Sequence, residues 1–472
     1  MLFTSPSFLF FFLPITLLLN FVFIKFNTKN LVLLLVSIFF YIFGEGELVL
    51  LMLASITLNY FFGIWIENSG TKKALIIAVT VNLLILVFYK YTNFIINNIN
   101  LITTIFDINL INNVKIILPI GISFYTFQSI SYLIDVYRKD NKAQRSFVDL
   151  ALYISLFPQL IAGPIVRYKD IALQLKNRVQ NIEKFASGLK RFIVGLFKKI
   201  IISNSLALIA DIIIDGDINQ LDAPTAWLGI IFYSLQIYFD FSGYSDMAIG
   251  LGRMLGFEFL ENFNFPYIAK SIREFWRRWH ISLSNWFRDY LYISLGGNRG
   301  SKSRTYINLA IVFFLTGLWH GASWNFVIWG LIHGFFIVIE RIGLDKSLEK
   351  TPILNNIYTL SIVVFAWVFF RIETFSGAIN YIQTMFFGTN NLTHYKFTMF
   401  LKTETVVILI IAAIMSFNGF TKFGYIIRNK FNRPQVLSFV EFLTNLGYLI
   451  LFFISLFYVA IGSYNPFIYF RF

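Results

Sequence analysis

The sequence predicts an all-α polytopic membrane protein. The chain of 472 residues is 57% hydrophobic and only 14% charged, and it contains 57 phenylalanines. Soluble domains carry about 25% charged residues, so this composition lies well outside their range. The mean hydropathy of +0.68 points the same way. No separable soluble domain, repeat or linker is visible, so we treat residues 1–472 as one integral membrane domain.

Apolar runs define the predicted helices. A helix needs about 20 apolar residues to cross the hydrocarbon core, which gives about 11–13 transmembrane or re-entrant helices here. The first run lacks a basic leader and a small-residue cleavage site, so we interpret it as a membrane span. The predicted spans are 7–24, 31–44, 47–66, 74–95, 116–137, 148–166, 188–213, 225–241, 305–320, 324–340, 356–371, 404–420 and 442–462.

Basic residues between the runs predict the orientation. Lys29, Lys72 and the basic residues of 138–145 mark cytoplasmic loops, whereas Glu45 and Glu47 mark the opposite side. This alternation places the N-terminus outside. We attribute the net charge of +14 to this topology and to contact with membrane lipid, and we expect no nucleic-acid partner because no such binding module is visible.

Two segments depart from the pattern of simple spans. "FPQLIAGP" at 157–164 predicts either that 155–185 dips into the membrane and returns, or that an amphipathic segment lies along the interface. In 240–300, glycines are expected to break the helix within "DFSGYSDMAIGLGRMLGFEF". This second segment is too polar to face lipid, and we expect it to fill a cavity entered from the cytoplasmic side.

Missing motifs exclude several kinds of chemistry. The chain has no cysteine, no GxSxG, no P-loop and no HExxH, so a thiolate nucleophile, a serine hydrolase, nucleotide-driven chemistry and a metal site are all unsupported. An HxxxxD box is also missing, because Asn285 and Asn325 stand five residues after His280 and His320. A carboxylate from Asp246 or Asp289 remains open as a partner in space.

His320 ends an apolar run in "GLWHGASWN". The flanking glycines Gly317 and Gly321 are expected to leave space around the ring, and Thr316 can reach one ring nitrogen from four residues back. Ionisable groups inside membrane spans are often functional. The alternative, a histidine that bridges two spans by hydrogen bonds, stays open.

His280 stands in "REFWRRWHISLSNWFRD". If 273–288 is one helix, Trp276, His280 and Ser284 share a face, and the neighbouring arginines can bind a phosphate-bearing ligand. The alternative is an amphipathic surface helix whose arginines touch lipid headgroups. His333 is expected to bond a neighbouring helix near Glu340, and the last histidine, His394, to lie in a solvated loop.

Long stretches resemble the membrane-bound O-acyltransferase (MBOAT) family. They are "FPQLIAGPIVRY", "YFDFSGYSDMAIGLGRMLGF", "NFNFPYIAKSIREFWRRWHISLSNWFRDYLYISLGGNR", "LTGLWHGASWNFVIWGLIHG" and "NPFIYFRF". The core signature covers about 115–341. Within the family they are similar to the bacterial branch that O-acetylates polysaccharides such as alginate and peptidoglycan, and more distantly to teichoic acid D-alanyl transfer proteins.

The resemblance implies a ring of helices around a central tunnel in the bacterial cytoplasmic membrane. It implies that His320 is the essential histidine at the constriction and that His280 is the second family position. It further implies acetyl-CoA as a cytoplasmic acyl donor, with no permanently bound cofactor. An extracytoplasmic esterase-like (SGNH) acetyltransferase partner would complete the transfer to a polysaccharide acceptor.

We therefore expect a membrane O-acetyltransferase. His320 is expected to take the proton of the attacking hydroxyl and His280 to orient a substrate. Transfer of D-alanyl or another acyl group is the closest alternative, and a lipid-linked sugar transporter is an alternative of another class. The predicted residues of the donor site and tunnel are Trp276, Arg277, Arg278, Trp279, Ser284, Asn285, Trp319 and Asn325.

Overall fold

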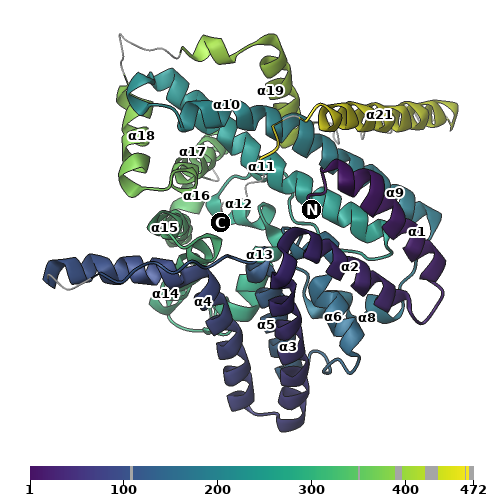
Figure 1. Cartoon of the computed structure of the whole chain (residues 1–472). Helices are drawn as coiled ribbons and strands as arrows, with labels where there is room; N and C mark the ends of the chain where they lie inside the picture. Colours follow the sequence, from purple (N-terminus) through teal and green to yellow (C-terminus); the bar gives the residue numbers. More distant parts are fainter. Residues whose placement is uncertain (107–109, 349–350, 389–395, 420–433, 463, 467–472) are drawn as a thin grey trace.

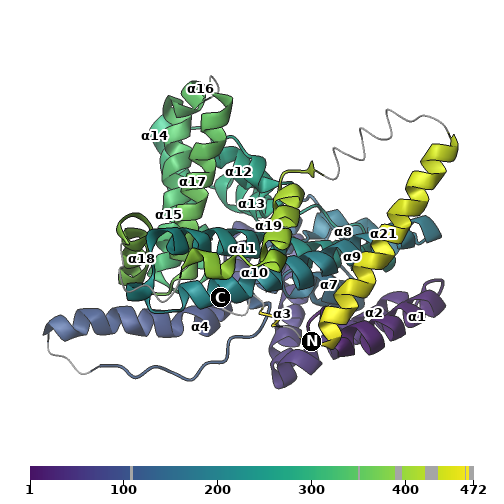
Figure 2. The ribbon, with the colours of Figure 1, turned by 90° about the horizontal axis from the view of Figure 1, so that it is seen from above.

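Helices build the whole described part of this computed structural model (Figures 1 and 2). It describes residues 1–472 except 107–109, 349–350, 389–395, 420–433, 463 and 467–472. Within these residues, six helical stretches are long and apolar enough to cross a membrane, which confirms an all-α polytopic membrane protein. They are Lys29–Ser69, Lys72–Phe106, Ile182–Ile214, Trp324–Leu348, Ile353–Arg371 and Gln435–Ala460.

The other predicted spans overlap helices that are shorter or less apolar than these six. The α-helices are α1 Leu13–Phe23, α2 Lys29–Glu45, α3 Val49–Ser69, α4 Lys72–Thr103, α5 Ile122–Tyr137, α6 Phe147–Ser155, α7 Phe157–Leu160, α8 Tyr168–Lys176, α9 Ile182–Phe197, α10 Asn204–Ile214, α11 Ala223–Met254, α12 Ile272–Arg278, α13 Ile281–Trp286, α14 Lys302–His320, α15 Trp324–Ile339, α16 Asp345–Leu348, α17 Pro352–Arg371, α18 Phe375–Phe387, α19 Thr403–Ser416 and α21 Pro434–Ala460. The π-helical turns are η1 Phe8–Phe12, η4 Lys198–Ser203, η7 Phe287–Tyr292 and η8 Glu340–Leu344, and the 3₁₀ turns are η2 Gly46–Leu48, η3 Thr104–Phe106, η5 Ile218–Gln220, η6 Pro266–Ile268 and η9 Phe397–Phe400.

Helix α11 runs unbroken to Met254, so the glycine break predicted within 240–259 is wrong for Gly243, Gly250 and Gly252; the helix ends only before Gly256, whose φ is 91°. The glycines serve close packing against α9 instead. A Cβ atom on Gly250 would lie 2.6 Å from the carbonyl oxygen of Gly188, and one on Gly195 would lie 2.6 Å from that of Gly243. Small residues let the backbones of two membrane helices approach closely. Interpreting glycine only as a helix breaker overlooks this function.

The buried acids of α11 are neutralised within the bundle. Asp240 forms an ion pair with Lys199, and both side chains are at most 2% exposed. Asp246 is paired with Arg191 at 2.6 Å and with Lys198 at 2.7 Å. These pairs satisfy charges that would otherwise be costly inside a membrane protein. Both carboxylate oxygens of Asp246 are therefore engaged by cations.

The segment around "FPQLIAGP" dips into the molecule and returns, which favours the first of the two predicted alternatives. Helix α6 leads inward, α7 is wholly buried, and an irregular turn precedes α8. The hydroxyl of Tyr153 donates to the carbonyl of Val166 at 3.0 Å, which joins the inward and outward limbs. Because protein covers this non-helical backbone on all sides, it is tolerated at membrane depth.

The polar segment 255–300 is irregular, with α12, α13 and η7 as its short helices. In Figure 2, α12 and α13 lie between α11 and the group of α14, α15 and α17. Glu340 accepts the backbone N–H groups of Ile272 at 2.6 Å and Arg273 at 3.0 Å, and so caps the start of α12. The indole of Trp286 donates to the carbonyl of Phe127 at 2.9 Å and anchors α13 on α5.

Two opposite sides of the molecule are marked by charge. On the side that we call the basic side, Arg145 forms an ion pair with Glu67, and Arg138 donates to the carbonyl of Asp289 at 3.0 Å. Lys72 begins α4 on this side, directly after α3 ends. On the acidic side, Glu45 accepts the backbone N–H of Ile120 at 2.9 Å.

Candidate active site

Three cavities lie along α14 and the loop that follows it. The basic cavity, of about 400 Å³, is lined by Arg273, Trp276, Arg277, Ile281, Leu283, Ser284, Asn285, Phe287, Arg288, Tyr292, Asn298, Leu309, Val312, Phe313, Thr316, Ile337 and Arg341. The histidine cavity, of about 240 Å³, is lined by Lys90, residues 118–124, Ile161, Trp319 and His320. The polar cavity, of about 380 Å³, includes Lys90, Tyr233, Gln236, Ser323, Asn325, Arg371 and Glu373.

The basic cavity has the character of an anion site. Four arginines line it, and its lining contains no acidic residue. Arg273 and Arg288 are paired with aspartates at 2.8 and 2.7 Å. Arg277 and Arg341 form no ion pair with any residue that the structure describes. Their guanidinium groups are therefore available to a ligand with phosphate groups, which guanidinium binds in a bidentate manner.

Asp289 holds the η7 turn beside this cavity. Its carboxylate pairs with Arg167 at 2.6 Å and Arg288 at 2.7 Å. Burial by itself raises the pKa of Asp289, but the Arg288 and Arg167 guanidinium groups outweigh burial and hold the pKa of that carboxyl below its usual value. Asp289 thus fixes an arginine at the cavity and is engaged there rather than beside a histidine.

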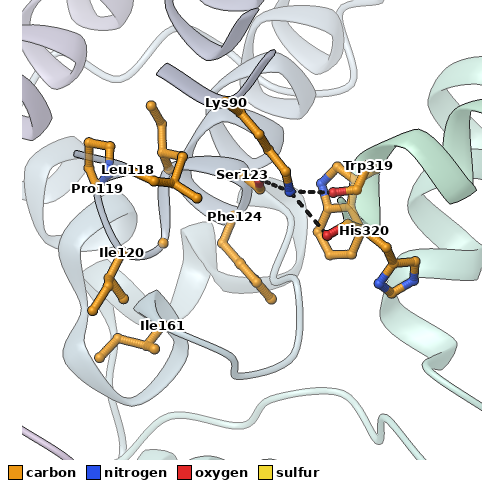
Figure 3. A pocket seen from close by; sticks show the side chains of 11 residues that line it. Lys90, Leu118, Pro119, Ile120, Ser123, Phe124, Ile161, Trp319 and His320 are labelled. Atoms are coloured by element: carbon orange, nitrogen blue, oxygen red, sulfur yellow. Dashed lines mark hydrogen bonds between the residues drawn. The ribbon is translucent and has the colours of Figure 1, made fainter. Parts of the chain in front are cut away.

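His320 ends α14 and lines the histidine cavity, with 5% of its surface exposed. Its imidazole is surrounded by aromatic rings. The ring centroids of Trp319 and Trp329 both lie 4.9 Å from it, and that of Phe370 lies 5.2 Å away. In Figure 3 the imidazole extends away from the Lys90 amine and beyond the indole of Trp319.

Lys90 and Tyr91 of α4 hold the end of α14. Lys90 Nζ donates to the carbonyl oxygens of Trp319 at 2.5 Å and His320 at 3.3 Å, as Figure 3 shows. The Tyr91 hydroxyl donates to the carbonyl oxygen of Leu318 at 2.7 Å. The last carbonyls of a helix have no partner within it, so these two side chains satisfy groups that would otherwise be unpaired. They also fix the backbone that carries His320.

His280 lies at a break rather than on a continuous helix. Helix α12 ends at Arg278 and α13 begins at Ile281, so the condition of one helix over 273–288, under which Trp276, His280 and Ser284 would share a face, is not met. The backbone of His280 is left-handed, with φ 43° and ψ 54°, a conformation that non-glycine residues adopt at a cost. Its ring centroid lies 6.0 Å from that of Trp319. The two candidate histidines therefore flank one tryptophan.

An aromatic cluster joins the basic cavity to the histidine cavity. Trp276 lines the basic cavity, its ring lies 5.7 Å from that of Trp329, and Trp329 contacts His320. Along the helix, Thr316 of the basic cavity and His320 are separated by one turn, or about 6 Å. The two cavities therefore border the same helix one turn apart, with the rings of Trp276 and Trp329 between them.

Buried polar atoms in this cluster have no hydrogen-bond partner among the described residues. In folded proteins such atoms are few, and a bound ligand or water explains them. Unpartnered atoms also occur elsewhere in the described chain, but the ones here lie beside the two cavities, where a polar substrate or water can take up these bonds. They are the ring nitrogens of His333, Nε1 of Trp276, Trp319 and Trp329, Nε2 of His280 and Oγ of Ser284.

The structure brings most of the predicted site residues to these cavities. Trp276, Arg277, Ser284 and Asn285 line the basic cavity, Trp319 the histidine cavity and Asn325 the polar cavity. Arg278 instead forms an ion pair with Glu274, and Trp279 packs against Phe263, Phe275 and Trp367. These two residues support the fold beside the site.

Details of the histidine surroundings also differ from the sequence-based expectation. A Cβ atom on Gly317 would lie 2.3 Å from the carbonyl oxygen of Phe326, and one on Gly321 would lie 2.2 Å from its ring. These glycines therefore admit α15 rather than open space around the imidazole. Thr316 donates to the carbonyl of Val312, within its own helix.

Other residues complete this comparison. His333 makes no hydrogen bond with the described residues, so the predicted bond to a neighbouring helix is wrong. Its ring instead stacks on Phe275. His394 lies outside the described residues. Sequence reasoning missed Lys90 and Arg341. For Lys90 the signal was present, because an ionisable residue within a predicted span is a functional candidate.

Comparison with known proteins agrees with this geometry. The family model of MBOAT, the membrane-bound O-acyltransferase family, matches residues 138–372. A probable alginate O-acetylase from Pseudomonas putida is 42% identical over the full length of both chains. The peptidoglycan O-acetyltransferase of Helicobacter pylori is 38% identical over 82% of this chain and 80% of its own.

A more distant relative shares the central part of the chain. The teichoic acid D-alanyltransferase of Bacillus subtilis is 30% identical over 55% of this chain and 68% of its own. Family membership favours an enzyme over a sugar transporter, since the named relatives all transfer acyl groups. The chain is a multi-pass membrane protein that belongs to the membrane-bound O-acyltransferase family, and it is an acyltransferase.

Proposed function

We propose that this acyltransferase moves an acetyl group from cytoplasmic acetyl-CoA to a polysaccharide of the cell envelope on the other side of the membrane. One observation carries the proposal. Helix α14 passes from a cavity lined by arginines to a second cavity that contains His320. Relatives at 38% to 44% identity are named for O-acetylation of alginate and peptidoglycan, which supports acetyl as the acyl group.

The charges of the two sides support the direction of transfer. The basic cavity adjoins η7, which Arg138 contacts on the basic side. The histidine cavity includes Ile120, whose backbone is bonded to Glu45 on the acidic side. Basic loops face the cytoplasm, where acetyl-CoA is made, so the donor site faces its supply.

The donor fits the basic cavity by chemistry. Arg277 and Arg341 are available for the phosphates of coenzyme A, and their side chains are exposed at the cavity. The pantetheine arm carries amide groups, which can bond the unpartnered hydroxyl of Ser284. With the thioester at the inner end of the cavity, the acetyl carbonyl is about one helical turn from His320.

The transfer itself needs a proton acceptor. The hydroxyl oxygen of the acceptor attacks the thioester carbonyl, and the C–S bond breaks. In this step the imidazole of His320 takes the hydroxyl proton and passes it to the departing thiolate, so that an acetate ester and free coenzyme A result. The indoles of Trp319 and Trp329 enclose this point and exclude water, which limits hydrolysis of the thioester.

Completion of the transfer outside is assigned to an extracytoplasmic esterase-like partner, as the family resemblance implies. The test is analysis of ester-linked acetate in envelope polysaccharides of a deletion strain, complemented with wild type or with His320→Ala. Loss of acetate on deletion and its return only with wild type is expected. Unchanged acetate on deletion would overturn the assignment. Acetate restored by a normally abundant His320→Ala protein would overturn the role of the imidazole.

A further inference from the structure

The side chain of Asn262 lies at the centre of a hydrogen-bond network beneath His280. Asn262 lies in the irregular segment that follows α11 and is 0% exposed. Its Oδ1 atom lies 3.1 Å from Nδ1 of His280, 2.8 Å from the hydroxyl oxygen of Ser282 and 3.2 Å from the backbone nitrogen of Ser282. Its Nδ2 atom donates to the hydroxyl of Ser245 at 3.0 Å. One buried amide thus joins α11 to the residues on both sides of the helix break.

These contacts determine which way the amide faces. A backbone N–H can only donate, so the Asn262 atom that faces the backbone nitrogen of Ser282 must be the carbonyl oxygen. The same oxygen faces Nδ1 of His280, and an amide oxygen can only accept. Nδ1 of His280 therefore carries a proton.

The tautomer of His280 follows from this proton. In a neutral imidazole with a proton on Nδ1, Nε2 carries the lone pair and is an acceptor. Nε2 of His280 is buried and has no hydrogen-bond partner within the described part of the chain. His280 lines none of the three cavities, and its ring lies 6.0 Å from that of Trp319, which lines the histidine cavity. A buried acceptor without a protein partner can take its donor from a bound ligand or a water.

The backbone around His280 is fixed by the same residue. The backbone carbonyl oxygen of Asn262 accepts the N–H of Ile281 at 2.9 Å, and its side-chain oxygen accepts the N–H of Ser282. These bonds clamp the two residues that follow the left-handed His280. Strained backbone of this kind persists where the surroundings over-determine it, and it concentrates at functional sites.

We propose that Asn262 is a positioning residue of the acyl-transfer site, which holds His280 as the Nδ1–H tautomer so that Nε2 accepts a hydrogen bond from a bound substrate. This inference rests on the proposed function. Asn262 itself contacts no substrate and acts through the imidazole. The bond partner is an N–H or O–H group of the donor arm or of the attacking alcohol, because only such groups can satisfy a neutral acceptor nitrogen.

A spectroscopic measurement tests the tautomer without any assay of activity. The chain has four histidines, so ¹⁵N-histidine labelling of the full-length protein in detergent or lipid gives a simple spectrum. The His280 signals are assigned by their loss in His280→Gln. A protonated Nδ1 with an unprotonated Nε2 is expected in wild type, and a shift towards the Nε2–H form in Asn262→Leu. A wild-type His280 that carries its proton on Nε2 would overturn the inference.

Kinetics test the role. Asn262→Leu and His280→Ala are expected to lower kcat/KM for acetyl-CoA by the same factor, about tenfold for one buried hydrogen bond. The double variant should be no worse than either alone, because both remove one interaction. Asn262→Asp, which keeps an acceptor oxygen, should restore most of the activity. Ser245→Ala is the matched control, since it changes only the Nδ2 side of the amide and should retain wild-type kinetics.

The outcomes separate this inference from the proposed function. Wild-type kcat/KM in a folded Asn262→Leu protein, or losses that add in the double variant, would overturn the positioning role. If the wild-type protein transfers no acetyl group from acetyl-CoA, the proposed function fails, whereas the labelling experiment still decides the tautomer. If Asn262→Leu does not fold, the wild-type spectrum and the Asn262→Asp kinetics still decide the inference.

Discussion

Replacement of Lys90 by methionine should impair catalysis without lowering the amount of folded protein in the membrane. Methionine keeps the length of the side chain and removes its amine. The change deletes the bonds to the carbonyls of Trp319 at 2.5 Å and His320 at 3.3 Å, and the bond to Ser123 at 3.3 Å. It leaves the last turn of α14 held by Tyr91 alone. The imidazole then loses its fixed position relative to the cavities.

The size of the effect follows from these distances. The short bond is worth about 1–3 kcal/mol, and each of the two long bonds is worth less than about 1 kcal/mol. The sum is about 1–5 kcal/mol, and each 1.4 kcal/mol corresponds to about a factor of ten in rate. Because the helix end can relax in part, we expect kcat to fall by about 10- to 100-fold, with KM for acetyl-CoA nearly unchanged.

The assay is acetyl transfer by purified protein in lipid, with kcat and KM measured separately. Tyr91→Phe is the matched control, because it removes one neutral bond to the same helix end and should cost less than about tenfold. Lys90→Arg keeps a donor and should recover part of kcat. A folded Lys90→Met protein with wild-type kcat, or one whose defect lies wholly in KM, would refute the capping argument.

Further predictions concern stability and the donor site. Asp240→Leu leaves the buried Lys199 charge without its partner and should lower the unfolding free energy by about 3–5 kcal/mol. The double variant Asp240→Leu with Lys199→Met should recover most of this free energy in thermal unfolding. Equal destabilisation of the single and the double variant would contradict the pairing. Arg277→Ala should raise KM for acetyl-CoA several-fold at unchanged kcat in steady-state kinetics, and an unaffected KM would remove Arg277 from the donor site. Gly330→Ala should lower the melting temperature because its Cβ would lie 2.3 Å from the carbonyl oxygen of Phe313, whereas Gly447→Ala, with nothing within 4 Å, should not.

The membrane class and both histidine blocks could be read from the sequence, since composition and apolar runs report directly on the hydrocarbon environment. The lining of the basic cavity by Arg277 was also foreseen, because charge at membrane depth requires a wet or ligand-filled place. The structural effect of the glycines was predicted less well. Their flexibility suggested a break in α11 and space around His320, but in both places the missing Cβ serves close helix packing.

Residues that act across the chain could not be predicted. Asn262 and His280 lie 18 positions apart, and Lys90 and His320 lie 230 apart. A lone asparagine in "ENFNFP" gives no local signal, because its function depends on the atoms that the fold brings to its amide. The break at His280 was missed for a similar reason. Helical spacing favoured one helix, and the bonds to Asn262 that stabilise the left-handed backbone come from another segment.

The most direct measurement is sided acetyl transfer in proteoliposomes of known orientation. Radiolabelled acetyl-CoA is supplied to one face, and a soluble acceptor glycan, with purified partner protein, to the other. Transfer is predicted only when the donor faces the side of Arg277, and none is predicted with His320→Ala. Equal transfer with the donor on the side of Glu45, or transfer by His320→Ala at the wild-type rate, would contradict a passage that leads from the arginines to the imidazole.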